Sequence, residues 1–123
     1  MGKLPNSLRT EAGERKYAED KAKGELKALA DEPSIVDWKH WRSIQNKYMY
    51  DTVLKEHHML VPRRVFGTFQ EVSLVEMVEL LSILKDLDQQ YDAVVLNTAR
   101  RRSVPDHFHV HLWNYKERED MSL

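Results

Sequence analysis

The chain of 123 residues contains no cysteine, so it can form no disulfide, no thiolate-ligated metal site and no cysteine nucleophile. Its formal net charge is −1, so it lacks the positive field that attracts long nucleic acids. It has no apolar run near the roughly 20 residues that span a bilayer. The opening "MGKLPNSLRT" has no apolar segment of the secretory kind behind its lysine. These absences predict a cytoplasmic protein that binds neither membranes nor long nucleic acids.

Composition divides the chain into three parts. Residues 1–30 are rich in charged residues and alanine, which favour helix, whereas Gly13 and Gly24 each weaken a helix by about 1 kcal/mol. We therefore expect a charged helical arm, peripheral to function. Residues 31–118 carry the apolar segments of a folded domain, and residues 119–123 form a polar tail. A chain of this length supports one such domain with a modest core.

The first half of the domain predicts a helical turn followed by two strands. Ser34 follows a proline and can cap a short helical turn. The apolar residues of that turn are then expected to face inward: Ile35, Val36 and Trp38. Residues 41–50 alternate partly between polar and apolar, and residues 57–62 form an apolar run that a proline ends. Both segments predict strands, joined as a hairpin.

The second half predicts one long helix and two more strands. In residues 73–91, Ser73 and Glu76 have the spacing of a capping box. Apolar residues then recur at three- and four-residue steps and predict the face that packs on the core: Leu74, Val78, Leu81, Leu87 and Tyr91. Residues 91–97 predict a buried strand and residues 107–115 a final one. The order of elements predicts an α+β fold, an antiparallel sheet with one main amphipathic helix packed on it.

Residues 107–113 read HFHVHLW and place three of the six histidines at alternate positions. Alternate side chains of a strand share a face, so His107, His109 and His111 are expected to project together onto a polar, solvent-reachable surface. The residues between and after them are expected to face the core: Phe108, Val110 and Leu112.

The residues alone leave three interpretations of these histidines open. They can be ordinary surface histidines. A pair of them, about 6.7 Å apart along the strand, could hold a metal ion together with His57 or His58, whereas all three on one ion would need a sharply bent strand. Finally, imidazole has an unperturbed pKa near 6.5 and is mostly neutral and nucleophilic at pH 7. His109 could then attack phosphorus while its neighbours fix its tautomer and donate to the phosphoryl oxygens.

The same seven residues match every position of the His-φ-His-φ-His-φ-φ signature of the histidine triad (HIT) family, where φ is apolar. "HHMLVPRR" (57–64) resembles the family's strand of the form His-x-x-φ-φ-Pro followed by two basic residues. "NKYMYD" (46–51) is similar to an Asn-x-Phe-Pro-Tyr element found upstream in many members, with methionine in place of proline. Asn97 lies where members often carry a nucleotide-contacting asparagine. The resemblance spans about residues 34–115.

The resemblance implies a HIT-like fold and a reaction at the α-phosphate of a nucleotide conjugate, without metal or cofactor. His109 would be the nucleophile and would form a nucleotidyl-histidine. His107 and His111 would orient it and contact phosphate, and His57 would complete the polar cluster. Hydrolysis and transfer both stay open, as do phosphoramidate and dinucleoside polyphosphate substrates. A homodimer formed through the helix and the neighbouring strand is also implied.

Substrate contacts are expected from four further residues. Asn97 would contact the nucleotide, and Asp51 would bind ribose hydroxyls or serve as a plain turn residue. The loop "ARRRSVPD" (99–106) stands where the family has a glycine-rich segment. In this loop Ser103 would donate its hydroxyl to phosphate, and Arg102, within the run of three arginines, would hold an anionic leaving group or a second phosphate. The rival functions are a non-catalytic nucleotide-binding protein and, less favoured, a histidine-ligated metal protein.

Overall fold

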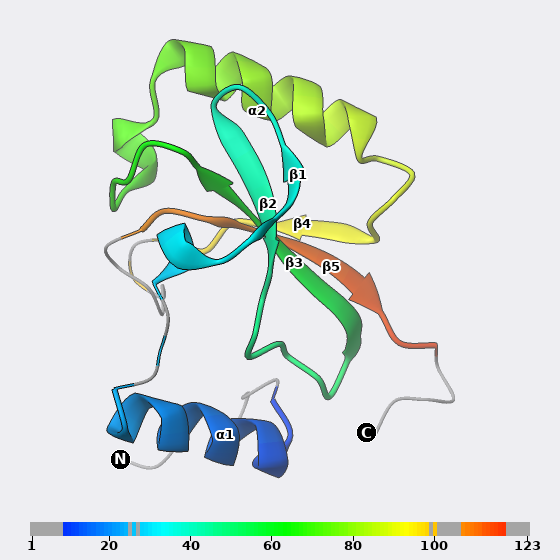
Figure 1. Cartoon of the computed structure of the whole chain (residues 1–123). Helices are drawn as coiled ribbons and strands as arrows, with labels where there is room; N and C mark the ends of the chain where they lie inside the picture. The colour runs from blue at the N-terminus through cyan, green and yellow to red at the C-terminus, as the bar shows by residue number, and fades with distance from the viewer. Residues whose placement is uncertain (1–8, 25, 27, 99, 101–106, 118–123) are drawn as a thin grey trace.

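The structure is a computed structural model, and it describes residues 9–24, 26, 28–98, 100 and 107–117. Its elements in chain order are α1 (Glu11–Ala22), the short 3-10 helix η1 (Leu29–Asp31), β1 (Ser34–Asp37), β2 (Trp41–Gln45), β3 (Leu54–Pro62), η2 (Phe69–Glu71), α2 (Leu74–Asp86), β4 (Ala93–Val95) and β5 (Val110–Tyr115). The described strands form one antiparallel sheet in the order β1-β2-β3-β5-β4. Helix α2 packs on this sheet, and α1 lies on the opposite side (Figure 1). The α+β class is confirmed.

The centre of the sheet is formed by β3 and β5. Each has a partner strand on both sides, because β3 also pairs with β2 and β5 also pairs with β4. The antiparallel pairing of β2 with β3 confirms the predicted hairpin. Strand β5 begins at Val110, so the first three residues of the HFHVHLW motif precede the strand rather than belong to it. The expected core residues of the motif are nevertheless buried: Phe108, Val110 and Leu112.

Helix α2 begins where the capping box predicts. The Ser73 side chain accepts a hydrogen bond from the Glu76 amide, and the Glu76 carboxylate accepts one from the Ser73 amide. Glu76 is buried and also accepts two bonds from the guanidinium of Arg64, at 2.7 and 3.2 Å. The start of the helix is therefore tied to the segment that follows β3.

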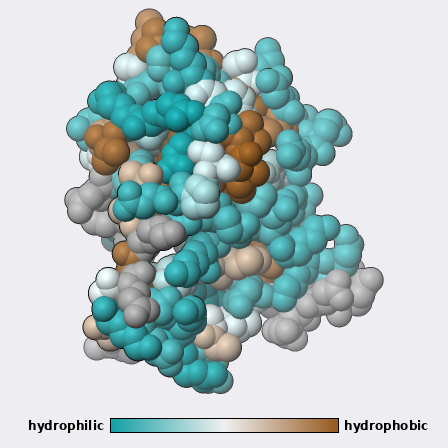
Figure 2. Space-filling view, viewed as in Figure 1, coloured by the Kyte–Doolittle hydropathy of each residue, from teal (hydrophilic) through white to brown (hydrophobic). Residues whose placement is uncertain are grey.

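The predicted core-facing side of α2 is wrong. Leu74, Val78 and Leu81 are 78%, 60% and 57% exposed, and Figure 2 shows hydrophobic surface at the top of the molecule, where α2 lies. The sheet is instead covered by Leu80 and Ile83, together with Leu87 and Tyr91, which the prediction included. Apolar residues occur nearly all round this helix, so their spacing fits more than one face. The homodimer expected through this helix stays a prediction.

The helical turn expected at residues 34–38 is wrong, because these residues form the edge strand β1 and end beside it. Their backbone pairs antiparallel with β2, a contact that the local sequence does not reveal. Ile35 and Val36 are 48% and 41% exposed and do not face inward, whereas Trp38 packs against the core. The other edge strand, β4, is a strand as predicted but is not buried, since Val94 is 44% exposed.

The described part of the N-terminal arm confirms a helix, α1. Its N-cap is Thr10, whose side chain accepts a hydrogen bond from the Gly13 amide at 3.1 Å. None of the helices in the described ranges combines the length and the apolar character needed to cross a membrane.

Candidate active site

The four histidines predicted as catalytic lie close together but are buried. The exposed fractions of His57, His107, His109 and His111 are 0%, 6%, 3% and 1%. The expectation of a solvent-reachable face is therefore wrong. The reason is the segment after β2, which folds over the strands and places the ring of Tyr50 with its centroid 4.7 Å from that of His57.

The middle histidine has a defined tautomer. Nδ1 of His109 lies 3.0 Å from the backbone carbonyl oxygen of His107. A carbonyl oxygen accepts and cannot donate, so Nδ1 carries the proton. In the neutral ring Nε2 then has no proton and presents its lone pair, which is the form a nucleophile needs. The backbone of His107 fixes this tautomer, whereas the sequence analysis expected the neighbouring rings to do so.

The rings of His57 and His111 form a directed chain of hydrogen bonds. The Tyr50 amide donates to Nδ1 of His57 at 3.2 Å, so the neutral His57 ring carries its proton on Nε2. That nitrogen lies 2.7 Å from Nδ1 of His111 and donates to it. His111 then carries its own proton on Nε2, 3.2 Å from the side-chain amide of Asn97. Rotation of the Asn97 side-chain amide by 180° exchanges its nitrogen and oxygen, and the oxygen then accepts the hydrogen bond from Nε2 of His111.

Burial keeps these rings uncharged. It is the largest cause that lowers the pKa of His57 and of His111 from 6.5 to about 3, and the charge of Arg9 contributes in both cases. Burial also lowers the pKa of His107. At neutral pH the rings of His57, His107 and His111 are therefore uncharged.

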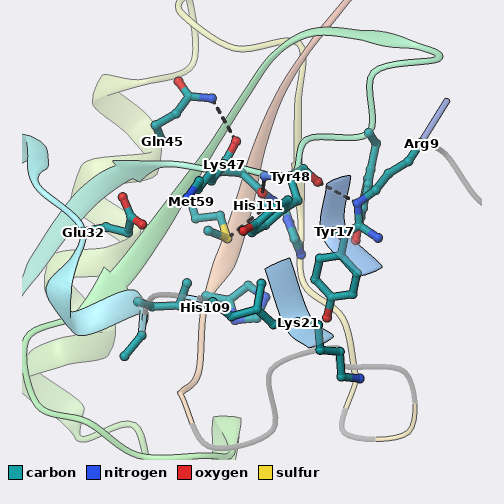
Figure 3. Close-up of a pocket in the computed structure, with 15 residues that line it drawn as sticks. Arg9, Tyr17, Lys21, Glu32, Gln45, Lys47, Tyr48, Met59, His109 and His111 are labelled. Atoms are coloured by element: carbon teal, nitrogen blue, oxygen red, sulfur yellow. Dashed lines mark hydrogen bonds between the residues drawn. The ribbon is translucent and has the colours of Figure 1, made fainter. Parts of the chain in front are cut away.

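A pocket of about 400 Å³ opens beside the cluster, within the size range of small-molecule sites. His109 and His111 form one part of its wall (Figure 3). Leu29 of η1 and Met59 of β3 supply apolar wall, and Gln45 supplies an amide at the end of β2. The remaining wall comes from the segment after β2 and from the N-terminal arm. The arm was expected to be peripheral to function, whereas in the structure it contributes to the wall of this pocket.

The predicted substrate-binding residues have different positions. Asn97 lies at the end of the histidine chain and is brought into the site. Asp51 holds the arm instead, since its carboxylate oxygens accept hydrogen bonds from the amide and hydroxyl of Thr10 at 2.7 and 3.0 Å. Arg102 and Ser103 lie outside the described residues.

The sequence analysis predicted only His109 and His111 of the residues that line the pocket, and the lining residues that it missed include Arg9, Asn46 and Tyr50. The last two belong to "NKYMYD", which was noted as a resemblance but given no role. Nδ2 of Asn46 lies 3.1 Å from Nε2 of His57, and because both nitrogens carry protons in the chain described above, this is a contact and not a hydrogen bond. For Arg9 no local signal exists, because its place in the pocket depends on how the arm docks.

Metal binding has little geometric support here. Within the described ranges, no group of three or more His, Cys, Asp or Glu side chains is arranged to hold a metal ion. His57 and His111 point their facing nitrogens at each other at 2.7 Å, and a shared proton fills that gap. These nitrogens therefore bond to each other rather than converge on a common ion.

No protein-family model and no curated protein matches the sequence. Among solved structures, the chain is similar to a HIT family hydrolase from Legionella pneumophila Philadelphia 1, at 18% identity and a TM-score of 0.52, with 76% of this chain and 86% of that chain covered. It is also similar to a histidine triad protein from Clostridium difficile, at 16% identity and a TM-score of 0.48, with 80% and 88% covered. The first of these likenesses shows a HIT-like fold.

Proposed function

We propose that the protein is a nucleotide hydrolase or nucleotidyl transferase of the HIT type, which reacts through a nucleotidyl group bound to His109. One observation carries the proposal. The ring of His109 lines a pocket of nucleotide-compatible size, and its Nδ1 is engaged by a carbonyl oxygen, so the lone pair is on Nε2. The HIT-like fold supports the same conclusion.

In the first step Nε2 of His109 attacks the α-phosphorus, and the bond from phosphorus to the leaving group breaks. The leaving group departs with the bonding electrons and takes up a proton. Both nitrogens of the ring are then substituted, so the ring is cationic. The carbonyl oxygen of His107 accepts a hydrogen bond from Nδ1–H and stabilises that charge, which lowers the free energy of the intermediate. Water or another acceptor then attacks phosphorus and loses a proton. The bond between phosphorus and Nε2 breaks, and its electrons return to Nε2, which restores the neutral ring.

The pocket offers complementary surfaces for the rest of a nucleotide. Leu29 and Met59 provide an apolar surface for a base, and the amides of Gln45 and Asn46 can bond to its edge or to the ribose. Asn97 would act through His111 by holding its tautomer. Roles for Asp51 on ribose, and for Arg102 and Ser103 on phosphate, stay predictions.

The test is the mass of the intact protein after brief mixing with an adenylate conjugate, run on the wild type, on His109→Ala and on His40→Ala as a control outside the cluster. We expect a nucleotidyl adduct in the wild type and in His40→Ala, and none in His109→Ala. Turnover that survives His109→Ala would refute the mechanism. Nucleotide binding with neither adduct nor turnover would favour the rival, a binding protein, which the burial of His109 also suits.

A further inference from the structure

The N-terminal arm is built into the wall of the pocket. Thr10, the cap of α1, bonds to Asp51, and the hydroxyl of Tyr48 donates to the buried Asp20 of α1 at 2.6 Å. The rings of Tyr17 and Tyr48 pack edge to face at 5.1 Å. Hydrogen bonds at both ends of the helix therefore hold α1 against the segment after β2.

This docking places Arg9 in a structured environment. Its guanidinium lies 4.6 Å from the ring centre of Tyr17 and 5.2 Å from that of Tyr50. Nε donates to the carbonyl of Tyr48 at 2.8 Å, and one terminal nitrogen bonds to Glu14 at 3.3 Å. These two bonds use two of the five N–H donors of a guanidinium. Cation–π contacts with two rings hold the guanidinium in place.

The fixed positive charge of the pocket comes largely from this arm. Tyr17 and Lys21 are four residues apart and share the face of α1 that lines the pocket. Arg9, which precedes the helix, lines the pocket beside them (Figure 3). Lys47 adds a third cation, against the single carboxylate of Glu32 among the described lining residues. The rings of His57, His107 and His111 are neutral at pH 7, so the balance of a polyanion falls mainly to these cationic side chains.

We propose that the arm belongs to the substrate site, and that Arg9 and Lys21 bind an anionic group that the substrate carries beyond its reacting phosphate. This rests on the proposed function. It assigns the substrate to nucleotides with a polyphosphate chain, in preference to phosphoramidates whose leaving group is uncharged. A guanidinium held against two aromatic rings suits bidentate binding of a phosphate.

The test compares kcat/KM for diadenosine tetraphosphate and for adenosine phosphoramidate in the wild type and in Arg9→Gln, Lys21→Gln and the double variant. Charge-assisted hydrogen bonds predict that the double variant loses about tenfold or more on the polyphosphate and less than about twofold on the phosphoramidate. Arg15→Gln, on an exposed position of α1, is the charge-matched control and should change neither value. Arg9→Lys keeps the charge but not the paired N–H donors of the guanidinium, so its kcat/KM on the polyphosphate should lie between those of Arg9→Gln and the wild type.

Equal losses on both substrates would overturn the inference, because they would mean that the variants only displace the arm. Unchanged values on both substrates would overturn it as well. If the wild type turns over neither substrate, the proposed function fails separately, and calorimetric binding of ATP and AMP decides the inference. Tighter binding of ATP than of AMP, lost in the double variant, would support an anion subsite in the arm. Equal affinities, or no binding of either, would refute it.

Discussion

The neutral histidine chain predicts a steep loss of stability in mild acid. The pKa values of His57 and His111 are about 3 in the folded chain against 6.5 in an unfolded one. Between these values the unfolded chain binds protons that the folded chain does not, so stability is complete above pH 6.5 and falls as the pH falls toward 3. At about pH 5 each ring lowers the free energy of unfolding by about 2 kcal/mol, and the two rings together lower it by about 4 kcal/mol. Typical domains have a total stability of about 5–15 kcal/mol, so this loss is a large share.

Urea unfolding at a series of pH values from about 8 to about 5 measures this effect. Well below pH 6.5 the slope should approach about 2.7 kcal/mol per pH unit, which corresponds to two protons. The His40→Gln variant, changed outside the cluster, should keep that slope. Nitrogen-detected NMR of the histidine rings checks the cause directly, with the proton of His109 on Nδ1 and those of His57 and His111 on Nε2. Titration of either buried ring near pH 6.5 in the folded protein would refute the reasoning.

Two further predictions concern the supports of the site. Asp51→Ala removes both acceptors that hold Thr10, so we expect faster tryptic cleavage of the arm and a free energy of unfolding lower by about 1–2 kcal/mol. Cleavage at the wild-type rate would contradict this role. Glu76→Gln removes the carboxylate whose pKa Arg64 lowers to about 2 from 4.5. The wild type should therefore lose more stability than the variant as the pH falls from 4.5 to 2. The full shift would be about 3 kcal/mol, but the Arg64 side chain is 53% exposed and solvent screening reduces it to about 1–2 kcal/mol. Acid unfolding of both proteins measures the difference, and parallel curves would exclude the ion pair as its source.

Local signals predicted the fold where short-range chemistry decides it. The capping box placed the start of α2 correctly, because its two reciprocal bonds join residues three apart. The face of the same helix was not predictable in this way. Leu74 and Leu80 are equally apolar, and which one is buried depends on where the sheet lies. Strand β1 likewise depends on its pairing with β2.

The candidate site shows the same division. The alternation in the HFHVHLW motif correctly placed Phe108 and Leu112 in the core. It could not predict that His109 would be covered, because the cover comes from residues 46–51 and from the arm, far away in the sequence. The tautomer of His109 was also beyond prediction, since it depends on the orientation of one carbonyl.

The position of His57 and His111 on interior strands has a consequence for how a ligand reaches the pocket. β3 and β5 have neighbours on both sides, so their amide protons should exchange with solvent only when the whole sheet opens. Helix α1 is instead held to the domain by side-chain contacts, such as the hydrogen bonds of Thr10 to Asp51 and of Tyr48 to Asp20. Its separation from the domain should therefore need less free energy than opening of the sheet. The pocket thus has a floor in the centre of the sheet and a wall from α1 that should open more readily than that floor.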